Sequence, residues 1–360
     1  MRVALVYDRV NKWGGAERIL MALHELFPEA PLYTSVYNSR SATWARIFDI
    51  RSSFLQHVPF ARGSHEYFAL AMPIAFENFD FSEYDLVISV TSEAAKGIIT
   101  HPGTRHICYC LTPTRYLWSG YREYFSNPFF RVIASPAVLY LRRWDKIALS
   151  RPDTFLAISH EVQERIRKYY HKKVEIVYPP LSLEGVYTGR IKRGDYFLIV
   201  SRLVPYKRVD LAIKACNALA VPLKIIGSGS ELSSLRKIAG PTVQFLGNLT
   251  DQELVEYYKG CKALLFPGKE DFGLTILEAQ KYGKPVIAYR GGGALETILD
   301  GKTGLFFYPL TIKALVKTMR RFEKRRFDPR KCRRQAAHFS KERFKEEFLR
   351  KVEEEVGKDL

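Results

Sequence analysis

Runs of apolar residues alternate with amphipathic stretches along most of the chain. Continuous apolar runs are typical of strands buried in a parallel sheet, whereas apolar residues spaced three and four apart indicate helices. In the first half we predict strands at residues 2–7, 86–90, 98–100, 106–110, 154–158 and 174–178, and helices at residues 16–26 and 161–170. Strands that alternate with helices predict a parallel sheet with helices on both of its faces.

The alternation is interrupted between residues 178 and 195, where proline, glycine and charged residues accumulate, and it restarts at residue 196. From there we predict strands at residues 196–200, 223–226, 243–246, 263–266 and 285–289, and helices at residues 209–218, 231–239, 251–258 and 274–282. After Thr311 the chain is helical and strongly basic.

These patterns predict an α/β protein with two doubly wound, Rossmann-like domains followed by basic C-terminal helices. We expect an N-terminal domain at residues 1–180, a linker at residues 181–195, a C-terminal domain at residues 196–335, and a helix at residues 336–360 that crosses back to the N-terminal domain. Two such domains can place their ligand-binding strand ends opposite each other across a cleft.

Composition narrows the classes of function and location. The formal net charge of +18 implies an anionic partner: nucleic acid, an anionic membrane face or a phosphorylated substrate. The five cysteines are scattered, which favours a reducing compartment, and we interpret Cys108 and Cys110 as core residues because no second pair or histidine cluster stands at zinc spacing. We find no signal peptide and no apolar run long enough to span a bilayer, so we expect a cytoplasmic protein.

Two carboxylates, Glu270 and Glu278, are the strongest candidates for chemistry. Glu270 follows the predicted strand at residues 263–266, and the helix that begins near Gly273 carries Glu278. Free backbone N–H groups and the helix dipole make such a helix start suitable for a phosphate. Carboxylates on its two sides would suit the hydroxyl groups of a nucleotide sugar. The alternatives are that Glu270 compensates the helix dipole and that Glu278 is solvated.

Two cations follow the first predicted strand of the C-terminal domain. Arg202 offers a forked donor and Lys207 a point charge, and both emerge from the carboxyl end of that strand, where a ligand would bind. A diphosphate gains negative charge as a glycosyl bond breaks, so two fixed cations would lower the barrier. The alternative is a solvated basic turn.

Glycines mark further loops at the ends of predicted strands. The Gly14-Gly15 pair and the Gly227-Ser-Gly229 segment would allow a backbone to approach a phosphate, a sugar or a base closely, or would form tight turns without a ligand. Gly14-Gly15 is not the six-residue dinucleotide fingerprint, so nicotinamide chemistry gains little support.

In order and spacing, these elements resemble the retaining glycosyltransferases of family 4, which have the GT-B fold. The resemblance rests on Gly14-Gly15, Arg202 with Lys207, Gly227-Ser-Gly229, and Glu270-x7-Glu278 with Phe272-Gly273 between the two carboxylates. The segments 108–118 and 177–180 are similar to a bacterial, mannosyltransferase-like subgroup that builds O-antigen and exopolysaccharide.

The resemblance implies roles for these residues. Glu270 would bind hydroxyls of the donor hexose, Glu278 those of the ribose, and Arg202 and Lys207 the diphosphate of a GDP- or UDP-sugar. It implies no metal, because these cations and the helix dipoles would stabilise the diphosphate. The backbone would contact the donor at Gly14, Gly15, Gly227, Phe272, Gly273 and Leu274.

The acceptor side departs from the pattern, because Leu111 stands where the subgroup usually has a histidine. A retaining, front-face displacement can let the leaving phosphate take the proton of the acceptor, so that no protein base is required. Alternatively, specificity is altered or activity is weak. Asp8, His106 and His160 are possible substitutes for the histidine or structural residues, and Arg115 is a further acceptor-side candidate.

Aromatic and basic residues interleave between residues 115 and 144, around a helix-like apolar run at residues 132–141. Such a segment suits an anionic membrane surface, or it is a helical excursion packed on the first domain. A lipid-linked acceptor would explain both this segment and the net charge.

The sequence thus predicts a peripheral hexosyltransferase, mannose favoured, on the inner face of the cell membrane, with a lipid-linked or oligosaccharide acceptor in cell-surface polysaccharide synthesis. The competing hypotheses are a donor-binding paralogue with weak or no transferase activity, a nucleotide-sugar epimerase or phosphorylase, and a basic nucleic-acid-binding protein. No nucleic-acid-binding motif supports the last of these.

Overall fold

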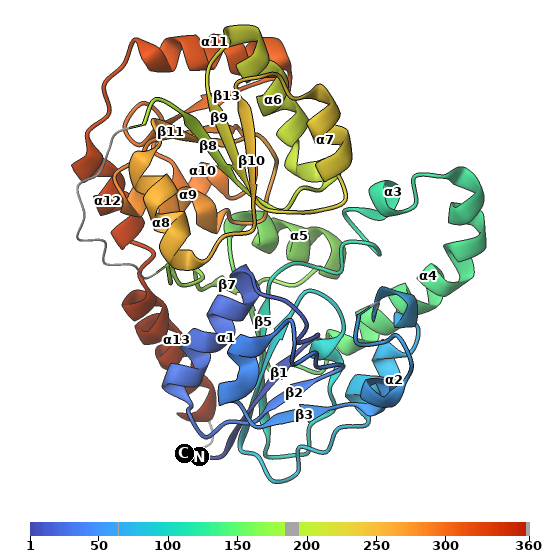
Figure 1. Ribbon diagram of the computed structural model, residues 1–360. Coiled ribbons are helices and arrows are strands. Elements are labelled where there is room, and N and C mark those ends of the chain that lie inside the picture. The colour runs from blue at the N-terminus through green and yellow to red at the C-terminus, as the bar shows by residue number, and fades with distance from the viewer. Residues whose placement is uncertain (64, 184–193, 358–360) are drawn as a thin grey trace. The chain divides into compact units, whose positions relative to one another are not determined.

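The computed structural model describes residues 1–63, 65–183 and 194–357, and the chain forms two compact units (Figure 1). Unit 1 comprises Met1–Pro180 and Glu342–Leu360, and unit 2 comprises Leu181–Lys341. The predicted linker at residues 181–195 falls largely outside the described residues. Each unit is a parallel sheet with helices on both faces, which confirms the predicted α/β class.

The sheet of unit 1 has the strand order β3-β2-β1-β4-β5-β6-β7. Its strands are β1 (Val3–Tyr7), β2 (Leu32–Thr34), β3 (Ile50–Ser52), β4 (Leu86–Thr91), β5 (Arg105–Cys110), β6 (Thr154–Ala157) and β7 (Glu175–Ile176). Its helices are α1 (Gly15–Leu26), α2 (Met72–Glu77), α3 (Tyr121–Tyr124), α4 (Pro128–Ala148), α5 (His160–Tyr170) and α13 (Lys341–Val356). Short 3-10 helices are η1 (Thr43–Ile47), η2 (Phe54–His57), η3 (His65–Phe68) and η4 (Ala95–Gly97).

The sheet of unit 2 has the strand order β10-β9-β8-β11-β12-β13. Its strands are β8 (Phe197–Val200), β9 (Leu223–Ile226), β10 (Val243–Gly247), β11 (Ala263–Phe266), β12 (Val286–Tyr289) and β13 (Gly304–Phe307). Its helices are η5 (Pro205–Lys207), α6 (Val209–Leu219), α7 (Leu232–Ile238), α8 (Asp251–Gly260), α9 (Leu274–Lys281), α10 (Ala294–Thr297), α11 (Ile312–Glu323) and α12 (Pro329–Ala337).

Alternate residues of each buried strand in unit 2 supply a core on each face of the sheet. Ile199 and Leu265 pack with α6, α7 and α11 on one face, whereas Leu198 and Leu264 pack with α8, α9 and α10 on the other. Strands buried on both faces explain the continuous apolar runs in the sequence. These two cores hold the strand ends, and therefore the loops that follow them, in fixed positions.

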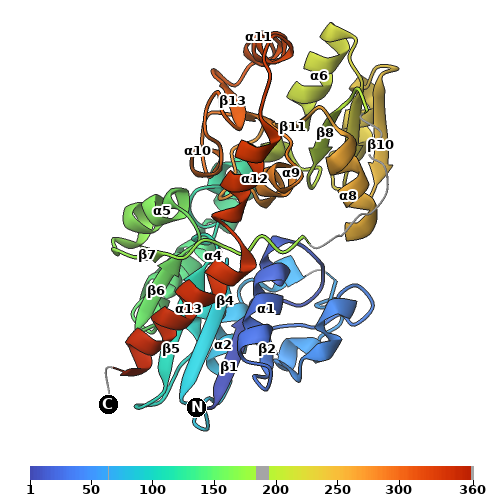
Figure 2. The same ribbon diagram turned by 90° about the vertical axis from the view of Figure 1, so that its left-hand side faces the viewer.

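The last helix returns to unit 1. Phe344 and Phe348 of α13 are buried and contact the ring of Tyr109 in β5, with ring centroids 5.9 and 5.8 Å apart. Figure 2 shows α13 lying along the sheet of unit 1. Lys351 of α13 also pairs with Glu175 at 2.8 Å.

The predicted strand at residues 98–100 is wrong. This segment follows η4, and although Ile98 is buried and extended, residues 98–100 form no part of either described sheet. Three strands, β2, β3 and β13, were not predicted. The first two are three residues long, so their apolar signals are weak. β13 is apolar after Gly304, but it is only four residues long.

Candidate functional site

The order of strands in unit 2 identifies one edge of the sheet as the candidate site. The chain moves outward from β8 through β9 to β10 and then returns to β11 on the other side of β8. Ligands of open α/β sheets bind at the carboxyl ends of the strands where the order reverses in this way. The loops after β8 and β11 occupy that position, and they carry Arg202, Lys207 and Glu270.

Lys207 and Glu270 form an ion pair between these two loops. Their side chains are 11% and 19% exposed, so the pair is partly shielded but accessible to a ligand. Gly268 allows the contact, because a Cβ atom there would lie 2.7 Å from the carbonyl oxygen of Tyr206 and 2.8 Å from the Cα of Lys207. The backbones of the two loops therefore touch, and a residue larger than glycine would push them apart.

Tyr206 links the two predicted cations, which the sequence analysis did not anticipate. The exposed Arg202 donates a hydrogen bond from Nη2 to the Tyr206 hydroxyl at 2.7 Å, and Lys207 Nζ lies 5.3 Å from the centroid of its ring. Arg202 and Lys207 therefore flank one aromatic ring at the strand end. A tyrosine in a basic turn gives no local signal of this role, since the contact depends on how η5 folds back.

The N-terminus of α9 adjoins the ion pair. Gly273 is the N-cap with a left-handed φ of 92°, and no side chain caps the helix. The first N–H groups, beginning with that of Leu274, thus lie at the positive end of the dipole, as expected. Phe272 has a buried side chain in edge contact with Phe339, with centroids 5.5 Å apart, so only its backbone would be available to a donor.

The second predicted carboxylate lies in α9 and is held by a neighbour. Glu278 is only 5% exposed, and its Oε2 accepts a hydrogen bond from the hydroxyl of the fully buried Tyr258 at 2.6 Å. Tyr258 stacks on Tyr282, and burial together with the charge of Glu278 raises the pKa of Tyr282 to about 12. This contact between Tyr258 of α8 and Glu278 of α9 was not predicted from the sequence.

Two further loops at the same edge of the sheet contain glycines that contact the loops carrying Arg202 and Phe272. Gly227 follows β9 with a φ of 130°, and a Cβ atom there would collide with the carbonyl oxygen of Ser201, next to Arg202. A Cβ atom on Gly293, in the loop after β12, would collide with the backbone of Phe272. Unit 2 therefore brings together Arg202, Lys207, Gly227, Glu270, Phe272, Gly273 and Leu274, and Glu278 lies further along α9, against Tyr258.

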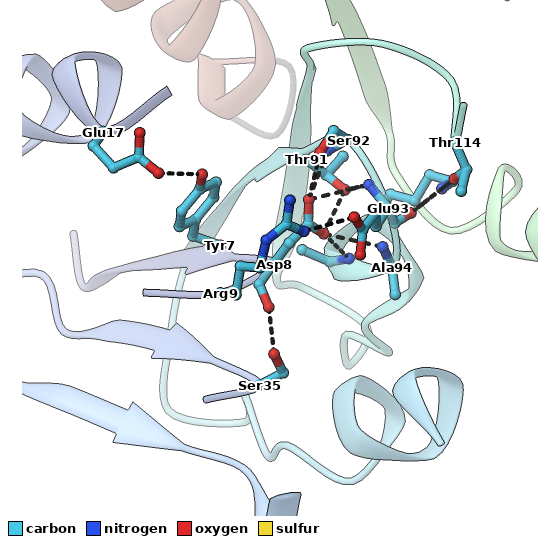
Figure 3. Close-up of polar contacts among 12 residues, drawn as sticks. Tyr7, Asp8, Arg9, Glu17, Ser35, Thr91, Ser92, Glu93, Ala94 and Thr114 are labelled. Atoms are coloured by element: carbon cyan, nitrogen blue, oxygen red, sulfur yellow. Dashed lines mark hydrogen bonds and ion pairs between the residues drawn. The ribbon is translucent and has the colours of Figure 1, made fainter. Parts of the chain in front are cut away.

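Gly14 and Gly15 belong to unit 1, at the start of α1. Gly14 is an extended N-cap without a side-chain cap. Glu17 in the first turn is buried and accepts a hydrogen bond from the Tyr7 hydroxyl at 2.7 Å (Figure 3). A Cβ atom on Gly14 would lie 3.1 Å from Glu17 Oε2, so the buried Glu17 side chain leaves little room for a larger residue at position 14.

Asp8 lies at the strand reversal of unit 1, between β1 and β4, and its carboxylate ties the two strand ends together (Figure 3). It accepts a hydrogen bond from Thr91 Oγ1 at 2.9 Å and hydrogen bonds from four backbone N–H groups at 2.6–3.0 Å, those of Ser92, Glu93, Ala94 and Ala95. These contacts give Asp8 a structural role.

An ion pair that sequence reasoning did not identify stands beside Asp8. Arg9 Nη1 lies 2.6 Å from Glu93 Oε1, with side chains 13% and 20% exposed. Burial raises the pKa of Glu93 above its ordinary value, and the charge of Arg9 offsets only part of this rise.

The remaining acceptor-side candidates occupy distinct settings. Leu111 is half-buried and donates its N–H to Thr91 O at 2.8 Å, and Arg115 begins a turn in which its carbonyl accepts from the Gly120 N–H at 2.8 Å. His106 is fully buried beside Ser89, 2.8 Å from Nε2 to Oγ, and burial lowers its pKa to about 3, so it is neutral. His160 is exposed at the start of α5, after the N-cap Ser159.

The structure also places the two predicted core cysteines and the interleaved segment. Cys108 and Cys110 are buried free thiols. The helix-like run of residues 132–141 lies within α4, which packs on unit 1 through Val138 and Leu141.

Among the described residues, no helix is long and apolar enough to cross a bilayer, and no cluster of three or more His, Cys, Asp or Glu could hold a metal ion.

Most of unit 2 matches the model of a known protein family. Residues 188–339 match the family model of glycosyl transferases group 1. The matched segment contains the Lys207–Glu270 ion pair, the α9 N-terminus and Glu278.

Among curated relatives, the GDP-mannose-dependent alpha-(1-6)-phosphatidylinositol monomannoside mannosyltransferase of Mycolicibacterium smegmatis is 37% identical over 131 residues, 31% of this chain and 34% of that protein. The O-antigen chain mannosyltransferase C of Escherichia coli is 28% identical over 198 residues, 50% of this chain and 51% of that protein. The chain thus spans between a third and a half of the length of these relatives.

A solved structure resembles the whole chain. HepE of Anabaena, in complex with UDP, has a TM-score of 0.73 and 18% identity, over 98% of this chain and 100% of that chain. At this identity the likeness shows the fold, and with the two doubly wound sheets it confirms the predicted GT-B fold.

Proposed function

We propose that this protein is a retaining hexosyltransferase of family 4 that moves a hexose, mannose favoured, from a GDP- or UDP-sugar to a lipid-linked or oligosaccharide acceptor in cell-surface polysaccharide synthesis. The observation that carries the proposal is the Lys207–Glu270 ion pair at the strand reversal of unit 2, beside the uncapped N-terminus of α9. The names of the two mannosyltransferase relatives support the hexose, and that of the E. coli protein supports the acceptor class.

A bound donor would break the ion pair between Lys207 and Glu270, and each residue would then contact a different part of the donor. Lys207 and Arg202 would bind the diphosphate, together with the first N–H groups of α9. Glu270, released from Lys207, would accept hydrogen bonds from hydroxyls of the hexose. Glu278, held by Tyr258, would accept hydrogen bonds from the ribose hydroxyls. Gly14, Gly15 and Gly227 would let the backbone approach the donor.

Transfer with retention needs no base from the protein in this proposal. The bond between the anomeric carbon and the diphosphate breaks, and the bond to the acceptor oxygen forms on the same face of the sugar. The acceptor proton passes to the departing phosphate oxygen, and Lys207 and Arg202 stabilise the charge that develops there. Leu111 is compatible with this route. It also favours the second candidate function, a donor-binding paralogue with weak or no transfer.

A thermal-shift series tests the proposal. GDP-mannose and UDP-glucose stabilise the fold if they bind only the folded chain, by an amount that grows with ligand concentration over Kd. We expect one of them to raise the unfolding temperature and to transfer its sugar to a lipid-linked acceptor. Stabilisation without transfer supports the paralogue, and no stabilisation by any nucleotide sugar overturns the donor-site assignment.

We also propose peripheral binding to the inner face of the cell membrane. Helix α4 buries Val138 and Leu141 on one side. The opposite side exposes Phe129 by 69% and Val132 by 72%, together with Ile133, Leu139, Tyr140 and Ile147. Arg143 and Lys146 are exposed on the same helix. An exposed apolar face with adjacent cations suits insertion among anionic headgroups.

A further inference from the structure

A hollow of about 460 Å³ lies beside the edge strand of unit 2. β13 pairs with β12 and ends the sheet, and α11 packs next to it (Figure 1). This volume is typical of sites for small ligands. Its lining includes three aromatic residues at and just after the end of β13, Phe306, Phe307 and Tyr308, and four cations from α11 and its C-terminus, Lys317, Arg320, Arg321 and Lys324.

The four cations carry uncompensated positive charge. Their spacing of three or four residues brings them close together along one side of α11, where like charges repel. All four are exposed, and within the described ranges none of them forms an ion pair or a side-chain hydrogen bond. Glu323, the acidic residue of this helix, pairs instead with Lys262 at 2.8 Å. A bound anion would relieve this repulsion.

The aromatic wall adds a second kind of contact. Tyr308 is 70% exposed while it stacks on Tyr289, with centroids 6.3 Å apart. An exposed ring beside arginines and lysines suits a ligand that combines phosphates with a planar ring or an apolar group.

The hollow is separate from the candidate donor site. The donor loops follow β8 and β11, whereas β12 lies between β11 and β13. None of the residues that line the hollow contributes to the Lys207–Glu270 site. The inference therefore does not depend on the proposed transferase function.

We propose that this hollow is a second anion site, which binds a ligand with two or more phosphate groups. A free nucleotide and the phosphorylated headgroup of a lipid both carry this chemistry. In either case the phosphates would contact Lys317, Arg320, Arg321 and Lys324, and Tyr308 would contact the adjoining group.

Calorimetric titration with inorganic tripolyphosphate tests the site, in the full chain carrying Lys207→Met to weaken binding at the donor loops. We expect the double change Lys317→Gln and Arg321→Gln to lower affinity at least about tenfold, since each removes a charge-assisted contact. Lys331→Gln with Arg334→Gln is the matched control, because it removes the same charge from the exposed surface of α12, outside the hollow. We expect it to change affinity less than about twofold. Equal losses in the two double variants, or no saturable binding, overturn the proposal.

Two further arms distinguish the sources of the phosphate. If a nucleotide is the ligand, Tyr308→Ala lowers affinity for ATP but not for tripolyphosphate. If a lipid headgroup is the ligand, the wild-type protein binds vesicles with phosphatidylinositol 4-phosphate more tightly than phosphatidylglycerol vesicles of equal charge, and the double change Lys317→Gln and Arg321→Gln removes this preference while binding to phosphatidylglycerol persists. Tight binding of a single-stranded oligonucleotide, lost equally in both double variants, would indicate a diffuse nucleic-acid surface and contradict the site.

Discussion

Lys207 and Glu270 follow different strands, yet their side chains form an ion pair where the strand order of unit 2 reverses. In the free protein, the side chain proposed to bind the phosphates is therefore paired with the side chain proposed to bind the hexose. Binding of a nucleotide sugar would replace one charge pair by two sets of contacts, so neither of the partly buried charges would be left without a partner.

Replacing Glu270 by Gln should reduce turnover more than nucleotide binding. The amide keeps the size of the side chain but loses the charge that would act on the hexose. We expect kcat for hexose transfer to fall by about 10²–10³-fold, as when one group that stabilises a transition state is removed. The affinity for the nucleoside diphosphate should change little. Glu256→Gln, on the exposed side of α8, is the control and should leave both quantities unchanged. An unaltered kcat in Glu270→Gln would refute the role.

Replacing Glu278 by Gln should weaken nucleotide binding. The change removes the charged acceptor proposed for the ribose hydroxyls, so the Kd for the nucleoside diphosphate should rise about tenfold or more. Tyr258→Phe should raise the same Kd by a smaller factor, because Tyr258 holds the carboxylate in place. Equilibrium titration measures both. If Tyr258→Phe lowered only thermal stability and left Kd unchanged, its role would be structural.

His106 should make unit 1 less stable in acid. Burial lowers its pKa from 6.5 to about 3, so the folded chain keeps it neutral while the unfolded chain binds a proton below pH 6.5. The free energy of unfolding is therefore unaffected by His106 above pH 6.5, and it declines as the pH falls from there toward the pKa of the folded state. Protonation of His106 in the unfolded chain should lower the free energy of unfolding by about 2 kcal/mol between about pH 7 and about pH 5. Denaturant unfolding of His106→Gln should show a loss with acid that is smaller by that amount. Equal losses in variant and wild type would contradict the prediction.

The exposed side of α4 should direct membrane binding. Phe129→Ser combined with Ile133→Ser removes two apolar groups that would insert, so we expect partitioning onto phosphatidylglycerol vesicles to fall at least about tenfold. Raising salt from about 50 mM to about 500 mM should also release the wild-type protein. Ile99→Ser is the control, since this residue of unit 1 is 51% exposed but lies outside α4. Sedimentation that is independent of lipid charge and unchanged in the double variant would remove the membrane proposal.

The sequence predicted the central strands well because their signal is local. The bounds of β9 and β11 are as predicted, and α9 differs by one residue. β2 and β3 were missed because three apolar or mixed residues do not distinguish a short strand from a loop. Residues 98–100 were misassigned for the converse reason, since burial of Ile98 does not require pairing with a strand.

The sequence by itself determined that carboxylates stand after a buried strand and on the following helix, because the order of residues and their apolar spacing are properties of neighbours along the chain. Only the tertiary structure decided the partners of those carboxylates. Lys207 meets Glu270 because the sheet places β8 beside β11, and Tyr258 meets Glu278 because α8 packs against α9 in the same core. Such pairs depend on packing between distant segments, which no local pattern specifies.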